Sequence, residues 1–327
     1  MHRSVTFKCR TTLAGLAAAT ALAALAGCAG GTAGNLTASP GSPALKGSVP
    51  DAGTGPQSVV AAMPPGKPTL SGPIGLAMSR KDDLYVANHY GTNGDILIYN
   101  SKNQLRKSTI TDGIDNPADL TFDRGGNLYV TNYTNQTVTV YDAAGKRIKS
   151  RTLHTDTSYN PSGVQIDSQG RVWVANRNNG NITIGEIQVF NKNGKVVASA
   201  TQGLVYPLGI VFSHKTGNAW IANSESPNDD MAIYTQSLQF VKTIPTPGFT
   251  PTYLAYAKTG LLYATNGLDA DVEVFNTKGK VVQTITNGLN LPYGIAFNKL
   301  GYFYVANVGN NTITEYNAKG KLIATIK

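Results

Sequence analysis

The chain has 327 residues, of which 41% are hydrophobic and only 14% charged, and its formal net charge at pH 7 is +9. Its 35 Gly and 16 Pro favour many turns over long helices. No stretch after residue 30 approaches the roughly 18 consecutive apolar residues of a membrane-spanning helix, so none is expected there.

The first 27 residues have the pattern of an export signal. A basic segment with Arg3, Lys8 and Arg10 precedes a short apolar run rich in Ala and Leu. Residues 25–28 read Leu-Ala-Gly-Cys and resemble the bacterial lipobox. This resemblance implies that residues 1–27 are a lipoprotein signal peptide and that Cys28 carries the lipid. We therefore expect an exported protein anchored to a bacterial membrane, at the outer membrane or cell surface if the cell is Gram-negative.

Residues 28–56 are dominated by Gly, Ala, Ser, Thr and Pro. Such a segment cannot bury enough apolar surface to order itself, so we predict a flexible tether. Cys9 would leave with the signal, and the mature domain would then have no free thiol for a disulfide, a metal or nucleophilic catalysis. The mature chain would keep only His89, His154 and His214, and a multi-histidine metal site is not expected.

Residues 57–327 contain one unit repeated six times. Each copy opens with a proline, and these prolines lie at positions 73, 117, 161, 207, 251 and 292. The phrases that follow, from PIGLAM to PYGIAF, predict a first strand. A second strand follows in each copy, as in LYVAN or VWVAN, and always ends in Asn. These residues are Asn88, Asn132, Asn176, Asn223, Asn266 and Asn307.

Two more apolar runs complete each copy. The third strands are expected to begin near residues 96, 138, 187, 231, 272 and 312, and the fourth over 105–110, 147–153, 195–200, 239–244, 280–285 and 321–326. Four short strands repeated about every 44 residues are typical of a propeller blade. We predict an all-β, six-bladed β-propeller with four antiparallel strands per blade, in which the C-terminus supplies its own last strand.

The repeat resembles two known groups of propellers. The Pro-x-Gly phrase, the YVAN-type strand and the Gly-Lys turn are similar to NHL repeats, and residues 127–142, NLYVTNYTNQTVTVYD, are similar to YVTN repeats. The resemblance covers residues 73–327 and implies the fold. Propellers of this kind include scaffolds, protein- or RNA-binding modules and metal-dependent enzymes, so it leaves the function open.

Positions that recur in all six copies build the fold, and positions that differ point to function. We therefore assign the six Asn a structural role, in which the side chain bonds an adjacent turn. At the third position of the opening phrase, four copies have Gly, whereas the second has Asp119 and the fifth has Tyr253. The second and fifth blades of a six-membered ring lie opposite each other, so both side chains are candidates for a ligand site at the channel mouth. The alternative is local variation with both side chains turned into packing or solvent.

The loops after the second strands supply further candidates, because variable polar loops on a rigid ring suit recognition. These candidates are His89, Tyr133, Arg177, Glu186, Glu225, Asp229, Asp230 and Asp271. Each of them is also compatible with a solvated loop position.

The enzymatic relatives make specific demands. Gluconolactonase-like propellers hold a divalent cation with Asn and Asp at the residue after the proline, together with a Glu. That residue is here Ile74, Ala118, Ser162, Leu208, Thr252 and Tyr293 in the six copies. Asp119 would be a lone ligand, whereas hard cations prefer several oxygens. Virginiamycin-lyase-like propellers use paired His, and the spacing here offers none. We therefore expect no cofactor and no metal, with Ca²⁺ or another divalent cation relevant only if the enzymatic alternative holds.

The turns between first and second strands and between third and fourth strands are rich in lysine. Examples are Lys81, Lys146, Lys195, Lys278, Lys280, Lys319 and Lys321, with few acids beside them. These turns share one face of a propeller, so that face would be attracted to an anionic surface. Solubilising lysines in tight turns explain the pattern equally well.

These observations predict a monomeric, non-catalytic binding or scaffold module of the cell envelope. Its partner would be an envelope protein, a glycan or a small ligand on the loop face, and export makes nucleic acid the least expected partner. The alternative is a metal-dependent hydrolase, lactonase or lyase of the gluconolactonase-like type with a channel-centred site.

Overall fold

The computed structural model describes residues 68–327, apart from residues 92, 107–108, 157, 179–183 and 225–228. Cys28 and Glu225 lie outside the described residues. Within the described chain, the secondary structure is almost entirely β, with two single-turn 3₁₀ helices, η1 (Lys149–Arg151) and η2 (Val308–Asn310). No helix in this part is both long and apolar enough to cross a bilayer.

In the described residues, twenty-three strands form six sheets, and within each sheet neighbouring strands are consecutive in sequence. The first three sheets are β1 (Pro73–Met78), β2 (Leu84–Asn88) and β3 (Asp95–Tyr99); β4 (Pro117–Phe122), β5 (Leu128–Asn132), β6 (Thr137–Tyr141) and β7 (Leu153–His154); and β8 (Tyr159–Ile166), β9 (Val172–Asn178), β10 (Gly185–Phe190) and β11 (Val196–Ala200). The last three are β12 (Pro207–Phe212), β13 (Ala219–Asn223), β14 (Asp230–Tyr234) and β15 (Phe240–Pro245); β16 (Pro251–Tyr256), β17 (Leu262–Asn266), β18 (Asp271–Phe275) and β19 (Val281–Ile285); and β20 (Pro292–Phe297), β21 (Phe303–Asn307), β22 (Thr312–Tyr316) and β23 (Leu322–Ile326).

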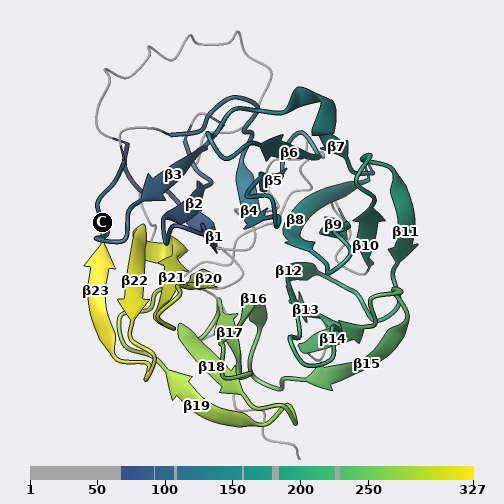
Figure 1. Ribbon diagram of the computed structural model, residues 1–327. Coiled ribbons are helices and arrows are strands. Elements are labelled where there is room, and N and C mark those ends of the chain that lie inside the picture. The colour runs from purple at the N-terminus through teal and green to yellow at the C-terminus, as the bar shows by residue number, and fades with distance from the viewer. Residues whose placement is uncertain (1–67, 92, 107–108, 157, 179–183, 225–228) are drawn as a thin grey trace, which may run out of the picture. The chain divides into compact units, whose positions relative to one another are not determined.

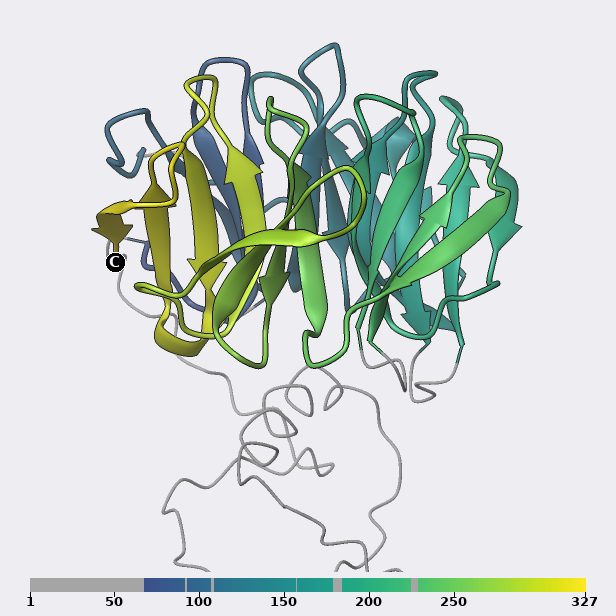
Figure 2. The same cartoon turned by 90° about the horizontal axis from the view of Figure 1, so that it is seen from below.

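The six sheets are the blades of a closed propeller. The first strands β1, β4, β8, β12, β16 and β20 contact one another in that order, and β20 contacts β1 to close the ring (Figure 1). Seen edge-on, the strands run between two faces of the ring (Figure 2). The asparagine face holds the asparagines at or near the C-terminal ends of the second strands, Asn88, Asn132, Asn176, Asn223, Asn266 and Asn307. The turn face lies opposite and holds the turns between first and second and between third and fourth strands.

The fourth strand is least regular in the first two blades. Among the described residues of 105–110, Leu105 and Ile110 form isolated bridges to Tyr99 and Ile96 of β3, and β7 has just two residues. The sequence predicted full strands over 105–110 and 147–153. In the second blade, η1 separates the Tyr141↔Arg147 bridge from β7.

Hydrophobic cores lie mainly between neighbouring blades. Trp173 and Ile187 of the third blade pack with Ile210 and Ile221 of the fourth. The seam between the last and first blades is built in the same way, because Leu76 packs in one cluster with residues of the sixth blade. Close to the axis the backbones nearly touch: a Cβ on Gly163 would lie 2.0 Å from the Leu208 carbonyl oxygen. Glycine at this position therefore lets adjacent blades converge.

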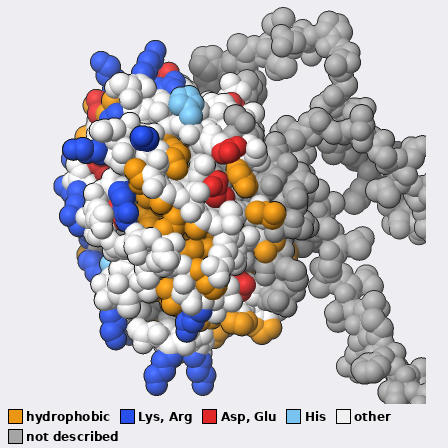
Figure 3. All heavy atoms as spheres, turned by 90° about the vertical axis from the view of Figure 1, so that its right-hand side faces the viewer, with side chains coloured by type: hydrophobic (Ala, Val, Ile, Leu, Met, Phe, Trp, Pro, Cys, Tyr) orange, Lys and Arg blue, Asp and Glu red, His pale blue; other side chains and the backbone are white. Residues whose placement is uncertain are grey.

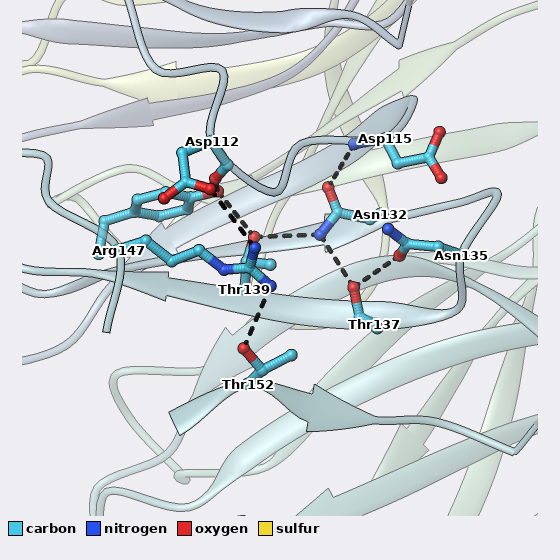
Figure 4. Close-up of polar contacts among 9 residues, drawn as sticks. Asp112, Asp115, Asn132, Asn135, Thr137, Thr139, Arg147 and Thr152 are labelled. Atoms are coloured by element: carbon cyan, nitrogen blue, oxygen red, sulfur yellow. Dashed lines mark hydrogen bonds and ion pairs between the residues drawn. The ribbon is translucent and has the colours of Figure 1, made fainter. Parts of the chain in front are cut away.

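In five of the six blades, the asparagine that ends the second strand accepts a hydrogen bond from the chain entering the first strand of the same blade. Asn132 Oδ1 accepts a hydrogen bond from the Asp115 backbone N–H at 3.0 Å, just before β4. Its Nδ2 donates to Thr137 Oγ1 and Thr139 Oγ1 at 3.2 and 3.0 Å (Figure 4). In the same way, Asn88 Oδ1 accepts a hydrogen bond from the Ser71 backbone N–H at 2.6 Å, and Asn223 Oδ1 accepts one from the Val205 backbone N–H at 2.8 Å. Repetition of this residue thus corresponds to a repeated structural contact.

Candidate binding site at the channel mouth

Six side chains, one from each blade, surround the axis at the asparagine face. They are His89, Tyr133, Arg177, Tyr206, Tyr253 and Tyr293, and all six are buried. The first three directly follow an asparagine at the end of a second strand, and the others sit at or near the start of a first strand. Because the starts of the first strands and the ends of the second strands lie close to the axis, residues far apart in the sequence meet in one cluster.

Arg177 is the central feature of this cluster. Arg177 is only 3% exposed, and its Cζ lies 4.4 Å from the centroid of the Tyr133 ring and 5.0 Å from that of the Tyr206 ring. An Nη1–H of Arg177 also donates to the Tyr206 hydroxyl. These contacts are favourable cation–π and hydrogen-bond interactions, but they supply no negative charge.

The guanidinium has no charged partner in the described chain. No described carboxylate lies within ion-pair distance of Arg177, and no described group accepts a hydrogen bond from its buried Nε. Burial by itself lowers the pKa of Arg177, whereas the phenolic oxygens of Tyr206 and Tyr133 raise it, and the net direction is upward. The group is therefore a buried, positively charged donor.

Asp119 and Tyr253 approach each other across the ring. The Tyr253 hydroxyl, from β16, donates to the Ala118 carbonyl oxygen of β4 at 3.1 Å. Asp119 Oδ2 accepts the Val164 backbone N–H of the third blade at 3.0 Å. Burial raises the pKa of the Asp119 carboxyl to about 7, and burial followed by the Asp119 charge raises the pKa of Tyr253. Asp119 thus titrates near neutrality at the base of the cluster.

His89 forms the edge of the cluster on the first blade. Its Nδ1 lies 3.1 Å from the Pro117 carbonyl oxygen, and its ring packs edge-on against Tyr133 with centroids 6.1 Å apart. The pKa of His89 is lowered to about 4, mainly by burial; the positive charge of Arg177 acts in the same direction and the hydrogen bond to Pro117 opposes it. The imidazole is therefore neutral at pH 7, and its Nδ1 acts as a donor to Pro117.

The acidic loop candidates occupy a different environment. Asp230 and Asp271 pair in register with Asn223 and Asn266, and Asn223 Nδ2 donates to Asp230 Oδ1 at 2.9 Å. Glu186 is opposite Asn176 in the same way. Burial raises the pKa of each of these three carboxyls and of Asp229. The structure keeps these acids beside their own blades and does not pair them with Arg177.

Sequence reasoning selected Asp119, Tyr253, His89, Tyr133 and Arg177 but did not select Tyr206 or Tyr293. Both lie beside a proline that opens a copy, where the other copies have no aromatic residue. An aromatic residue at that position was therefore the signal available in the sequence. Among the described residues, no three His, Cys, Asp or Glu side chains are grouped so that they could hold a metal ion.

No family model and no curated protein matches the chain. Solved structures match it in fold. A streptogramin B lyase superposes with a TM-score of 0.61 at 15% identity, over 79% of this chain and 83% of that chain. Hydrazine synthase from Kuenenia stuttgartiensis gives a TM-score of 0.61 at 17% identity, over 80% and 88% of the two chains.

Virginiamycin B lyase from Staphylococcus aureus gives a TM-score of 0.58 at 17% identity, over 77% of this chain and 83% of that chain. Identities this low establish a shared fold alone. The chain is a six-bladed β-propeller. Its narrower resemblance to NHL and YVTN repeats stays a prediction.

Proposed function

We propose that this propeller is a non-catalytic binding module that holds a small anion, with a carboxylate as the favoured group, at the channel mouth. The observation that carries the proposal is the buried Arg177 guanidinium, which has no carboxylate partner in the described chain and an unsatisfied Nε. Burying an ion without a counter-charge costs on the order of several kcal/mol. An anionic ligand would supply the missing charge and offset that cost.

The surroundings of Arg177 favour a planar, singly charged group. The guanidinium presents its donors as a flat fork, which matches a carboxylate in a two-point contact. The rings of Tyr133 and Tyr206 flank the guanidinium and exclude water from it. In a low-dielectric setting of this kind, a charge-assisted hydrogen bond is stronger than in water.

The cellular setting belongs to the same proposal. The export signal and the lipobox resemblance support a lipoprotein held at the membrane through Cys28, with residues 28–56 as its tether. The ligand would then be an envelope metabolite, or an acidic group on an envelope protein or glycan. The outer membrane or the cell surface would be its location in a Gram-negative cell.

The proposal is tested by measuring thermal unfolding of the full chain with sodium acetate, benzoate, succinate or phosphate, each against sodium chloride of equal ionic strength. We expect saturable stabilisation by at least one carboxylate and its loss in Arg177→Met. Arg171→Gln is the matched control, because Arg171 is paired with Asp167 at 2.6 Å on the turn face. Bound anion should also raise the His89 pKa, observed by NMR, because it cancels part of the Arg177 charge.

A purely structural arginine would behave differently. If Arg177 only plugs the channel, Arg177→Met should lower the unfolding free energy of the ligand-free protein, and no anion should stabilise the natural chain. For a ligand site, replacing an unpaired buried charge by an apolar side chain of similar length should be neutral or stabilising. The first pair of results would overturn the proposal.

The enzymatic alternative is favoured by one observation. Asp119 has a pKa of about 7 beside Tyr253, and such a carboxyl can accept and return a proton near neutral pH. The described residues do not fit the metal-dependent form, because they offer no suitable group of ligands. Consumption of a bound lactone or ester by the natural chain, lost in Asp119→Asn while binding persists, would establish catalysis.

A further inference from the structure

A groove of about 610 Å³ opens on the turn face between the fourth and fifth blades. Lys215, Lys242, Lys258 and Lys278 line it, and no Asp or Glu does. The equivalent groove between the first and second blades measures about 240 Å³ and is lined in part by Asp83 and Asp142. The groove between the fourth and fifth blades is therefore larger than the groove between the first and second blades, and its charged lining residues are all basic.

An aromatic contact that is present at three other blade interfaces is absent among the described residues at this groove. At those interfaces the aromatic side chain of a second strand packs edge-on against the last residue of the next blade's first strand. The pairs Tyr85–Phe122, Trp173–Phe212 and Tyr263–Phe297 have ring centroids 5.0, 5.3 and 5.0 Å apart.

Trp220 and Tyr256 hold the same two positions in the fourth and fifth blades. No ring contact joins them in the described chain, and both line the groove. Tyr256 packs instead against His214, with centroids 5.9 Å apart, and its hydroxyl bonds the Ser213 side chain. Trp220 and Tyr256 are partly buried against the core between these blades, and both contribute aromatic surface to the groove lining.

The indole N–H of Trp220 also differs from its counterpart. Trp173 Nε1 donates to Asp167 Oδ2 at 3.0 Å. The fourth blade has Ser213 in place of Asp167, and Trp220 Nε1 has no acceptor within the described part of the chain. The groove therefore offers a hydrogen-bond donor beside its aromatic surface.

The lysines around the groove are not neutralised by described acids. None of the four forms an ion pair with a described carboxylate, and the Lys258 ammonium donates to the Lys299 carbonyl oxygen at 2.5 Å. Figure 3 shows Lys and Arg side chains gathered along the edge that belongs to the turn face. The local field favours a ligand with several negative charges.

We propose that this groove binds an acidic oligosaccharide, such as a chain of uronic acid residues. The apolar faces of sugar rings fit against Trp220 and Tyr256, and the indole N–H can donate to a ring hydroxyl. The lysines are point charges on flexible stems, which suit single carboxylates spaced along a polymer. The site lies on the opposite face from Arg177 and does not depend on the ligand proposed there.

The test uses fluorescence titration of the full chain with a hexamer of galacturonic acid. The chain has two tryptophans, and Trp173 is fully buried, so Trp220 is the reporter. We expect saturable quenching that weakens with added salt, is absent in Trp220→Phe, and requires about tenfold more ligand in a Lys215→Gln, Lys278→Gln double variant. Lys146→Gln with Lys319→Gln, on the same face outside the groove, should change the affinity less than twofold, within about 0.4 kcal/mol.

Three results would overturn the proposal. Neutral maltohexaose binding as tightly as the acidic hexamer would remove the role of charge. Equal weakening in the two double variants would indicate a diffuse basic face rather than a groove. Anionic phosphatidylglycerol vesicles that bind through the groove lysines, with no response to the hexamer, would assign the groove to a membrane surface.

Discussion

At the scale of single residues, two buried titratable groups near the axis shift in opposite directions for one reason. Burial disfavours the charged form of each, so the pKa of His89 falls to about 4 and that of Asp119 rises to about 7. Both groups are then neutral over part of the range between these values. The guanidinium of Arg177 keeps its charge in the same cluster, which makes it the electrostatic exception.

The His89 shift predicts a pH dependence of stability. Its pKa is near 6.5 in the unfolded chain and about 4 in the folded one, so the unfolded state binds more protons between these values. The contribution of His89 to the free energy of unfolding is fully present above pH 6.5. As pH falls toward 4, this free energy decreases by about 3 kcal/mol. Denaturant unfolding of the natural chain and His89→Gln across this range measures the difference.

Asp119 contributes to the same pH profile with the opposite sign. Its folded pKa is raised, so its contribution is present below the unfolded value near 3.8 and is lost as pH rises through about 7. For this reason the His89 prediction concerns the difference between the two proteins. A difference that stays constant from pH 4 to 6.5 would contradict it.

At the scale of elements, the asparagine of each second strand joins two strands of one blade. Asn132 bonds the Asp115 N–H and two threonine hydroxyls, whereas among the described residues Asn176 bonds only the Gln188 side chain and its Oδ1 has no partner. The same repeated residue therefore contributes unequally to different blades.

This inequality predicts two different costs of truncation. Asn132→Ala strands a backbone donor and buried hydroxyls, and it should lower the unfolding free energy by about 2–3 kcal/mol. Asn176→Ala removes a group that is already partly unsatisfied, and it should cost about 1 kcal/mol or less. Chemical denaturation of both variants measures the contrast. Asn307→Ala, with the equivalent bonds to Asn290, Thr312 and Thr314, should match Asn132→Ala.

At the scale of the whole propeller, the described strands of the sixth and first blades meet without sharing a sheet. The sixth sheet consists of β20 to β23, and its contact with the first blade is made by side-chain packing and by hydrogen bonds such as that from Asn103 Nδ2 to Glu315 Oε2 at 2.7 Å. The seam uses the same kinds of apolar side chain as the other blade interfaces. We therefore expect the propeller to unfold as one cooperative unit.

Matched substitutions test whether the seam is as strong as an internal interface. Ile313 in the seam and Ile187 between the third and fourth blades hold the same repeat position, and both are fully buried. Each Ile→Ala change should cost about 3 kcal/mol in a single transition. A much smaller cost for Ile313→Ala, or a second transition, would show that the ring opens at the seam.

Much of the fold could be predicted because the same strand pattern occurs in six copies of the repeat. The prolines at 73, 117, 207, 251 and 292 begin first strands, and each Asn ends its second strand or, in the third blade, lies within it. Residues 147–153 were less predictable, because the 3₁₀ turn η1 separates the bridge at Arg147 from the short strand β7. Local alternation does not predict where a turn interrupts a strand.

The candidate site could be predicted only in part. Departures from the repeat indicated Asp119 and Tyr253, and the variable loops indicated Arg177, but neither observation indicated that Tyr206 and Tyr293 join them. Glu186, Asp230 and Asp271 were equally plausible in sequence, yet they pair beside their own asparagines.

The sequence by itself determined the blade, the number of blades and the strand order, because hydrophobic alternation and turn residues act over a few positions and recur. Tertiary structure alone decided which charges meet. Arg177 lies apart from the described carboxylates, and Trp220 makes no ring contact with Tyr256 in the described chain. Both facts depend on closure of the propeller, which sets distances between residues far apart in the chain. Those distances depend on the packing of all six interfaces together, which no local pattern contains.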